Sequence, residues 1–305
     1  MCHEVLLRRY RRLRVLCILL ALAAAGLFAL NYNSMVFRLL IGANYAHSEA
    51  LDSLFGRLLQ PGSEAGQGWD SRSNQMRYFD FAVMSAFTQA LREESGDVYT
   101  HLHMPGQYRR IRDIIAADGA RAEIRSLDER TVYLYLPNIS GVTRRFVVDN
   151  IALLSQYERL VLDLRGNYGG ELANAYRIAD LFLDNGSIIA LERGRMAALN
   201  RDIMARAPRL LDFSEVVILQ DSRTASAAES LIQALYYNIE VIIAGEKSFG
   251  KGTAQVVLPL QHGYSIQATV LRLYGPSGRS INGVGIPPDM PLDAEKLPYY
   301  VKNVI

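Results

Sequence analysis

The second half of the sequence alternates short apolar runs with longer amphipathic segments, and this alternation restricts the fold more than any other feature. Five runs are typical of buried β-strands: "TVYLYL" (131–136), "RLVLDL" (159–164), "VVIL" (216–219), "VIIAG" (241–245) and "AQVVLPL" (254–260). The intervening segments "TRRFVVDNIALLSQY", "ELANAYRIADLFLDN" and "SAAESLIQALYYN" have the apolar spacing of helices. Strands that alternate with helices predict an α/β domain with a largely parallel sheet, which we place at residues 121–305.

The N-terminus combines a basic tail with an uncharged apolar run. Residues 1–14 contain five arginines, and residues 15–31 follow with the sixteen-residue run "VLCILLALAAAGLFAL". This length falls between the about 20 residues of a membrane-spanning helix and the about 7 to 15 of a signal-peptide core. The run continues past Ala23 and Ala25, so we expect an uncleaved transmembrane anchor in the cell membrane, with secretion after signal cleavage as the alternative. The positive-inside rule places the arginines in the cytoplasm and the rest of the chain outside it.

Charge and cysteine content exclude several classes of function. Lys plus Arg total 33 against 31 Asp plus Glu, but the tail contributes five arginines and only one glutamate, which leaves 28 against 30 in the body. A slightly acidic body without clustered basic residues argues against nucleic-acid binding. Cys2 and Cys17 precede the body, which therefore has no disulfide, cysteine metal site or cysteine nucleophile.

His101 and His103 lack a third ligand, and we interpret them as part of a polar turn rather than a metal site.

The region before the α/β domain has a different pattern of apolar residues. Apolar residues recur at helical spacing over 33–60 and 72–94. The segment between them, "QPGSEAGQGWDSRS", is rich in Gly, Ser and Pro and predicts a linker near residues 60–73. We therefore expect a helical N-terminal region at 32–120.

The loop "GEKSFGKGT" (245–253) follows a predicted strand and resembles a phosphate-binding P-loop in spacing. A P-loop needs Ser or Thr directly after its lysine, to bind magnesium, and then a helix whose N-terminus holds the phosphates. Here Gly252 follows Lys251, and the next residues, "TAQVVLPLQ", indicate a strand. We therefore do not expect nucleotide binding, which leaves Lys251 either in an ordinary turn or with another task.

Two further loops leave predicted strands and enter predicted helices. "DLRGNYGGE" (163–171) has paired glycines, which suit a tight turn, a phosphate nest or an oxyanion hole. We interpret its Asp163 and Arg165 as structural charges. In "DSRTASAAES" (221–230), Ser226 and Glu229 fit a helix capping box. The same position would also suit a nucleophile at a helix N-terminus, with the N–H of Ala227 available to an oxyanion.

A nucleophilic serine needs a base, and no histidine lies in any of the three loops. His262 lies in the apparent turn "QHGYS". A lysine can replace histidine where burial lowers its pKa enough to leave the amine neutral. Lys251 is the candidate, with Gln255 four residues later to orient its amine.

Taken together, the loops resemble those of the C-terminal processing, or tail-specific, serine peptidase family. The family motifs appear in order as "DLRGNYGG", "TASAAE", "GEKSFGKGTAQ" and, at 273–289, "LYGPSGRSINGVGIPPD". The resemblance implies that Ser226 is the nucleophile, that Lys251 is the general base supported by Gln255, and that Gly170 and Ala227 are the oxyanion donors. It also implies the spiral α/β core of Clp-type proteases and crotonases, with neither metal nor nucleotide as cofactor.

The sequence departs from the family pattern in one large respect. Family members usually carry a PDZ domain between the helical part and the catalytic core, but only residues 109–130 separate Tyr108 from Thr131, and a domain needs at least about 50 residues. Substrate selection would then depend on strand addition beside the active site or on an adaptor protein. Tyr168 and Ala228 replace a usual proline and serine without removing a catalytic group.

These observations predict a membrane-anchored, extracytoplasmic endopeptidase with a Ser-Lys dyad. It would cleave exported proteins or peptides, and the family suggests sites near their C-termini. A catalytically silent peptide-binding scaffold at the membrane is the alternative.

Overall fold

The computed structural model describes residues 35–43, 45–47, 81–104, 106–260 and 263–292, together with a few single residues before position 50. The chain forms two compact units. The first comprises Met1–Pro105 and Val256–Ala268, and the second comprises Gly106–Gln255 and Thr269–Ile305. The predicted linker at 60–73, His262 and all but a few single residues of the predicted tail and anchor (1–31) lie outside the described residues. Within the part of the chain that is described, no helix has both the length and the apolar character needed to cross a membrane.

A six-stranded sheet organises the second unit. Strands β3 (Thr131–Tyr135), β4 (Arg159–Asp163), β7 (Glu215–Gln220) and β8 (Val241–Gly245) run parallel to one another. Strand β11 (Met290–Pro291) extends the parallel part beyond β8, and β2 (Glu123–Ser126) pairs antiparallel with β3. The strand order is β11-β8-β7-β4-β3-β2. The predicted α/β class and largely parallel sheet are therefore confirmed, whereas the narrower assignment to a Clp- or crotonase-like spiral stays a prediction.

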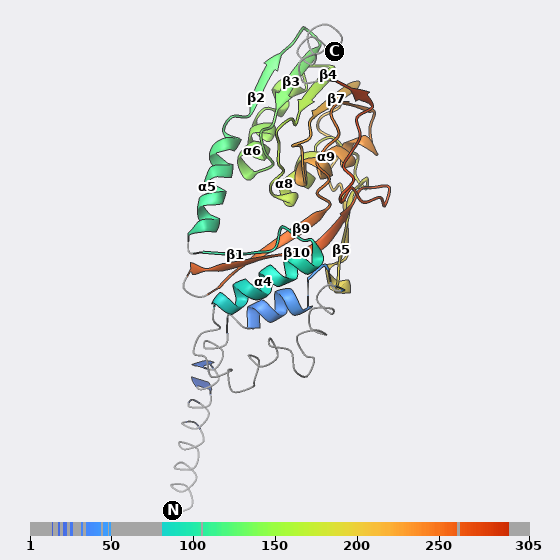
Figure 1. Ribbon diagram of the computed structural model, residues 1–305. Coiled ribbons are helices and arrows are strands. Elements are labelled where there is room, and N and C mark those ends of the chain that lie inside the picture. Colours follow the sequence, from blue (N-terminus) through green and yellow to red (C-terminus); the bar gives the residue numbers. More distant parts are fainter. Residues whose placement is uncertain are drawn as a thin grey trace, which may run out of the picture. The chain divides into compact units, whose positions relative to one another are not determined.

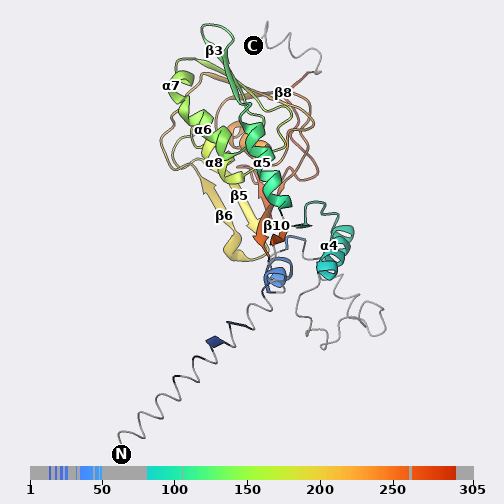
Figure 2. The same ribbon diagram turned by 90° about the vertical axis from the view of Figure 1, so that its left-hand side faces the viewer.

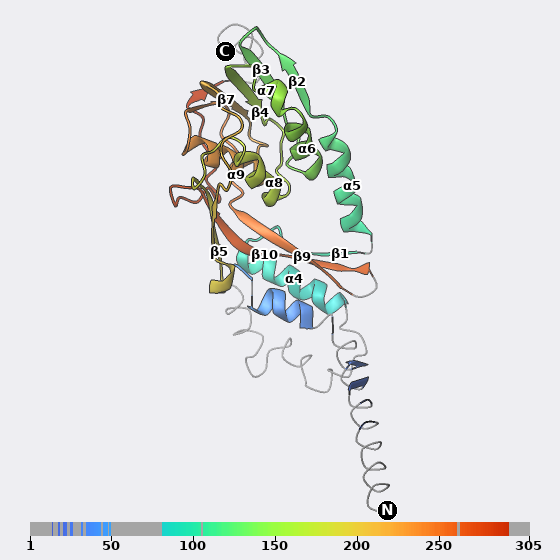
Figure 3. The ribbon, with the colours of Figure 1, turned by 180° about the vertical axis from the view of Figure 1, so that it is seen from behind.

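The main core lies between this sheet and the helices that connect its strands: α6 (Gly141–Asp149), α7 (Ile151–Leu154), α8 (Leu172–Ala179) and α9 (Ala227–Tyr236). Figures 1 and 3 show α6, α8 and α9 together on one side of the strands. Alternate residues such as Leu160 and Leu162 belong to this core, while Val161 between them packs into a smaller cluster on the other face. Because both faces are buried, the strands appear in the sequence as continuous apolar runs.

The predicted helix over 143–157 is interrupted in the structure. Asn150 leaves the helical conformation, with φ −110° and ψ 13°, and its side-chain amide donates to the carbonyl of Phe146 at 2.8 Å. An asparagine that bonds to nearby backbone competes with the helix hydrogen bonds. The segment therefore forms α6, which Ser140 caps, and the short α7.

A second, antiparallel sheet contains strands that the sequence pattern did not indicate. In the second unit, β5 (Ile188–Gly194) pairs with β6 (Arg201–Met204) on one side and with the end of β10 (Ser265–Tyr274) on the other. Figure 2 shows these three strands side by side. Strand β9 (Thr253–Pro259), which was predicted, pairs with β10.

The described part of the first unit contains the π-helix η1 (Arg38–Ala43) and helix α4 (Phe81–Ser95), so helix is present in both segments where the apolar spacing predicted it. The rings of Phe37 and Phe87 meet edge to face with their centroids 5.7 Å apart. Strand β1 (His101–His103) pairs antiparallel with the start of β10. The prediction of a turn at His101 and His103 was therefore wrong: both lie on a strand, and Nε2 of His103 lies 3.1 Å from the side-chain oxygen of Gln267.

Candidate active site

Ser226 occupies the turn between β7 and α9 in a strained conformation. Its φ is 57° and its ψ is −118°, and among the described residues it is the only non-glycine residue with a positive φ. Such a conformation costs on the order of 1–3 kcal/mol and persists only where surrounding contacts hold it. It is typical of functional turns, so the Ser226 turn is a candidate for chemistry as well as for capping.

Glu229 supplies the contacts that hold this turn. Its side chain is fully buried, and its Oε2 accepts hydrogen bonds from the main-chain N–H of Ser226 at 2.7 Å and of Lys251 at 2.8 Å. Its Oε1 accepts from the N–H of Gly250 at 2.7 Å and from the hydroxyl of Ser248 at 2.5 Å. The predicted capping glutamate thus also fixes the lysine loop. Oε2 accepts a hydrogen bond from both main-chain nitrogens. The distance between the main-chain nitrogens of Ser226 and Lys251 is therefore at most the sum of these two hydrogen-bond lengths.

The same contacts explain the glycine-rich loop at 245–253. Its N–H groups converge on an anion as a P-loop's would, but that anion is the chain's own Glu229 carboxylate. Gly250 has φ 91°, and a Cβ there would lie 2.6 Å from the main-chain nitrogen of Gly285. Strand β9 follows directly from Thr253, as predicted. The glycines therefore serve a tight turn around an internal carboxylate.

The paired glycines of the 163–171 loop lie against the Ser226 turn. A Cβ on Gly169 would come within 2.9 Å of the Ala227 nitrogen and of the Ser226 Cβ, and a Cβ on Gly170 would lie 2.0 Å from the carbonyl oxygen of Ile139. Both positions therefore require glycine. Within the described part of the chain, neither the N–H of Gly170 nor that of Ala227 donates to an acceptor. The two predicted oxyanion donors are thus in the same region and without an internal acceptor.

Asp221 joins the two loops. Its Oδ1 accepts from the N–H groups of Gly166 at 2.9 Å and Thr224 at 3.1 Å. Burial acts to raise the pKa of Asp221, but the bonds from the Gly166 N–H and from Arg223 outweigh burial and hold this pKa below its ordinary value. The Ala225 N–H also donates to the carbonyl of Asn167 at 2.9 Å. These contacts fix the position of the glycine pair relative to the serine turn.

Asp163 and Arg165 form a separate group at the end of β4. Arg165 Nε donates to both carboxylate oxygens of Asp163, at 2.9 and 3.1 Å, and the Tyr133 hydroxyl donates to the same carboxylate at 2.6 Å. This hydrogen bonding to Asp163 raises the pKa of Arg165. The arrangement agrees with the interpretation of both residues as structural charges.

Gln255 lies on β9, where two threonines hold its side chain. Its amide nitrogen donates to the hydroxyls of Thr253 at 3.3 Å and Thr269 at 3.1 Å. These bonds orient the amide and direct its donors toward the threonines. Its carbonyl oxygen is the group suited to accept a hydrogen bond from a lysine amine.

Comparison with known proteins identifies the family of this chain. Residues 130–292 match the profile of the family described as Peptidase family S41. The chain belongs to peptidase family S41. This range includes all four motifs on which the resemblance to C-terminal processing peptidases was based.

Curated relatives of this S41 chain are longer proteins. It is 36% identical over 146 residues to a chloroplastic C-terminal processing peptidase of Tetradesmus obliquus, a match that covers 48% of this chain and 31% of the relative. It is 39% identical over 133 residues to a carboxy-terminal-processing protease of Bartonella bacilliformis, covering 43% of this chain and 30% of the relative. The matches thus span about a third of those relatives.

Solved structures agree with the S41 assignment. The photosystem II D1 C-terminal processing protease superposes with a TM-score of 0.50 at 33% identity, over 55% of this chain and 44% of that protein. A lipoprotein from Streptococcus agalactiae superposes with a TM-score of 0.59 over 85% of this chain and 97% of that one, at 17% identity. The second likeness concerns the fold alone.

The sequence analysis missed part of the candidate site. It identified Glu229 only as a helix cap, and it assigned nothing to Ser248 or Asp221. Ser248 donates to Glu229 and accepts from the Ile286 N–H at 2.7 Å, which links the lysine loop to the glycine-rich segment near Gly285. An Asp placed three residues before a Thr at a strand end is a signal for the local turn that Asp221 forms, but the contact with Gly166 has no local signal.

Proposed function

We propose that this S41 chain is a serine endopeptidase in which Ser226 is the nucleophile and Lys251 the general base. The observation that carries the proposal is the Glu229 carboxylate, which binds the main-chain nitrogens of Ser226 and Lys251 through one oxygen. A dyad requires its two residues to be held in a fixed relation, and a buried, fully hydrogen-bonded carboxylate supplies that restraint.

The proposed reaction follows the usual course of acyl transfer. The neutral amine of Lys251 takes the proton of the Ser226 hydroxyl as Oγ attacks the peptide carbonyl carbon. The C–N bond then breaks as the lysine returns the proton to the leaving amine, and water hydrolyses the acyl-enzyme by the same steps. Gln255 supports the lysine by accepting a hydrogen bond from its amine.

The oxyanion of each tetrahedral intermediate would be bound by the N–H groups of Gly170 and Ala227. Two features support this role: both N–H groups are without an acceptor among the described residues, and Gly169 brings the glycine pair against Ala227. Ala227 also begins α9, so the helix dipole favours negative charge there. Donors fixed before the reaction stabilise developing charge without reorganisation.

The proposed substrates are exported proteins or peptides, cleaved outside the cytoplasm. The arginines ahead of the apolar run at 15–31 support a membrane anchor with this orientation. The names of the relatives, which describe processing of carboxy termini, support cleavage near chain ends. Only residues 109–130 separate Tyr108 from Thr131, fewer than the about 50 residues that a PDZ domain at this point would need, so an adaptor protein or strand addition would select the substrate.

Covalent labelling distinguishes a peptidase from the alternative, a silent peptide-binding scaffold. Prolonged incubation of the full chain with a fluorophosphonate should modify Ser226, identified by mass spectrometry of its tryptic peptide, and should leave the Ser226→Ala variant unmodified. An unfolded protein substrate should be cleaved in parallel. Absence of both labelling and cleavage in the folded protein would establish the scaffold instead.

A further inference from the structure

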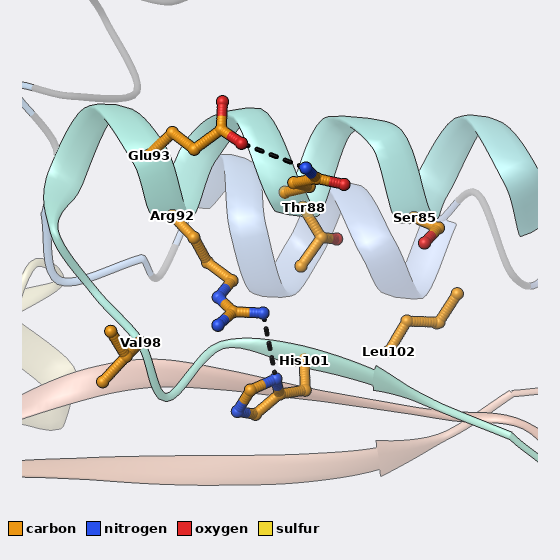
Figure 4. Close-up of a pocket in the computed structure, with 8 residues that line it drawn as sticks. Ser85, Thr88, Arg92, Glu93, Val98, His101 and Leu102 are labelled. Atoms are coloured by element: carbon orange, nitrogen blue, oxygen red, sulfur yellow. Dashed lines mark hydrogen bonds between the residues drawn. The ribbon is translucent and has the colours of Figure 1, made fainter.

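The first unit contains a pocket of about 430 Å³ between α4 and β1 (Figure 4). Ser85, Thr88 and Arg92 line it from the helix, and Val98, His101 and Leu102 line it from the segment that leads into and forms β1. Its volume is typical of sites for small ligands or for the end of a peptide. None of these residues belongs to the candidate catalytic group.

Arg92 and Glu93 bring opposite charges to the lining of the pocket. Its Nη1 lies 3.4 Å from Nδ1 of His101, while its Nε is buried and has no hydrogen-bond partner. Within the described segments Arg92 forms no ion pair, and Figure 4 shows it pointing toward His101 while Glu93 points away from it. A guanidinium keeps its charge, and a buried N–H without a partner is unfavourable. A position in the last turn of α4 suits a cation, but it does not account for the unpartnered Nε.

We propose that this pocket binds the terminal carboxylate of a peptide through Arg92. A planar guanidinium pairs with a carboxylate through two parallel hydrogen bonds, and one cation neutralises one such group. Arginine has no acceptor, so the guanidinium is the donor in its 3.4 Å contact with Nδ1 of His101. Glu93, which also lines the pocket, opposes a dianion more strongly than a single carboxylate.

The rest of the lining suits the last side chain of a peptide. Val98, which is 54% exposed, and Leu102 are the apolar side chains of the lining, and Figure 4 shows them on either side of His101. Apolar side chains in the same pocket as a guanidinium recognise an apolar C-terminal residue with a free carboxylate. This inference rests on the proposed peptidase function, for which it supplies a way to select chain ends without a PDZ domain.

Direct binding tests the proposal without turnover. Fluorescence anisotropy of a short labelled peptide ending in leucine would be measured with the full-length Ser226→Ala protein. The free acid should bind at least about tenfold more tightly than the same peptide with an amidated end, since charge-assisted hydrogen bonds are the strong ones. Arg92→Gln should abolish this difference, and Arg92→Lys should retain only part of it. The control Arg112→Gln, on the exposed helix α5 (Gln107–Gly119), should leave it unchanged.

Three results would overturn the carboxylate site. These are equal binding of acid and amide, a difference that survives Arg92→Gln, and Arg92-dependent binding of phosphatidylglycerol vesicles or inorganic phosphate in place of the peptide. Fluorophosphonate labelling of the wild type separates this question from catalysis. Labelling without acid-dependent binding removes the pocket proposal alone. Acid-dependent binding without either labelling or cleavage removes the peptidase proposal and leaves the pocket as a peptide-binding site.

Discussion

Replacing Ser226 with alanine is expected to lower cleavage of an unfolded protein substrate by at least about a thousandfold, because loss of a nucleophile leaves only binding and oxyanion stabilisation. The fold should survive the change. Alanine at φ 57° carries much the same backbone strain as serine, so we expect the free energy of unfolding to change by less than about 1 kcal/mol. Initial rates of cleavage and urea denaturation curves measure the two quantities.

Ser222 provides the matched control for this substitution. It lies in the same loop, is exposed, and precedes the strained turn. Ser222→Ala should cleave at the wild-type rate. If Ser226→Ala cleaved as fast as Ser222→Ala, Ser226 would be a helix cap and no more.

Glu229→Gln should lower kcat/KM by at least about a hundredfold and destabilise the second unit by roughly 3 kcal/mol or more, because a buried group with unsatisfied partners costs about 1–3 kcal/mol for each. Each carboxylate oxygen of Glu229 accepts two hydrogen bonds. An amide NH₂ in either orientation would face at least one main-chain N–H donor: those of Ser226 and Lys251 on one side, or that of Gly250 on the other. The Ser226 turn and the Lys251 loop would then lose their common anchor.

Glu246→Gln is the control for Glu229→Gln. Glu246 is exposed, and among the described residues its carboxylate accepts a single hydrogen bond, a long one of 3.3 Å from the Ser222 N–H. Its amide variant should therefore match the wild type in both activity and stability. The rate of fluorophosphonate labelling in folded Glu229→Gln separates positioning from general destabilisation. Wild-type labelling in a destabilised variant would show that the carboxylate serves the fold and not the dyad.

The strands of the parallel sheet could be predicted because a strand that is buried on both faces is a continuous run of apolar residues, as Leu160, Val161 and Leu162 illustrate. Strand β5 has no such continuous apolar run. Its Glu192 is buried and accepts hydrogen bonds from Arg201 at 2.9 Å and Tyr176 at 3.1 Å. A charged residue inside a strand is tolerated only through such distant partners, and the sequence pattern contains no information about them.

The candidate site divides in the same way. Ser226 and Lys251 lie in motifs that follow one another as in the C-terminal processing peptidases, so both could be named as candidates from the sequence alone. The role of Glu229 in joining Ser226 and Lys251 could not be predicted. Its contact with Lys251 spans 22 residues and depends on how two loops fold around one carboxylate. The capping box identified the residue and its nearest contact only.

Chemical rescue tests most directly whether an amine at position 251 activates Ser226. Lys251→Cys should be inactive, and treatment with 2-bromoethylamine should restore an amine at nearly the original length and with it the cleavage of an unfolded substrate. Iodoacetamide, which adds a neutral amide at the same sulfur, should restore nothing. Undiminished cleavage by Lys251→Cys, or failure of the folded, alkylated protein to regain activity, would contradict the Ser226–Lys251 dyad.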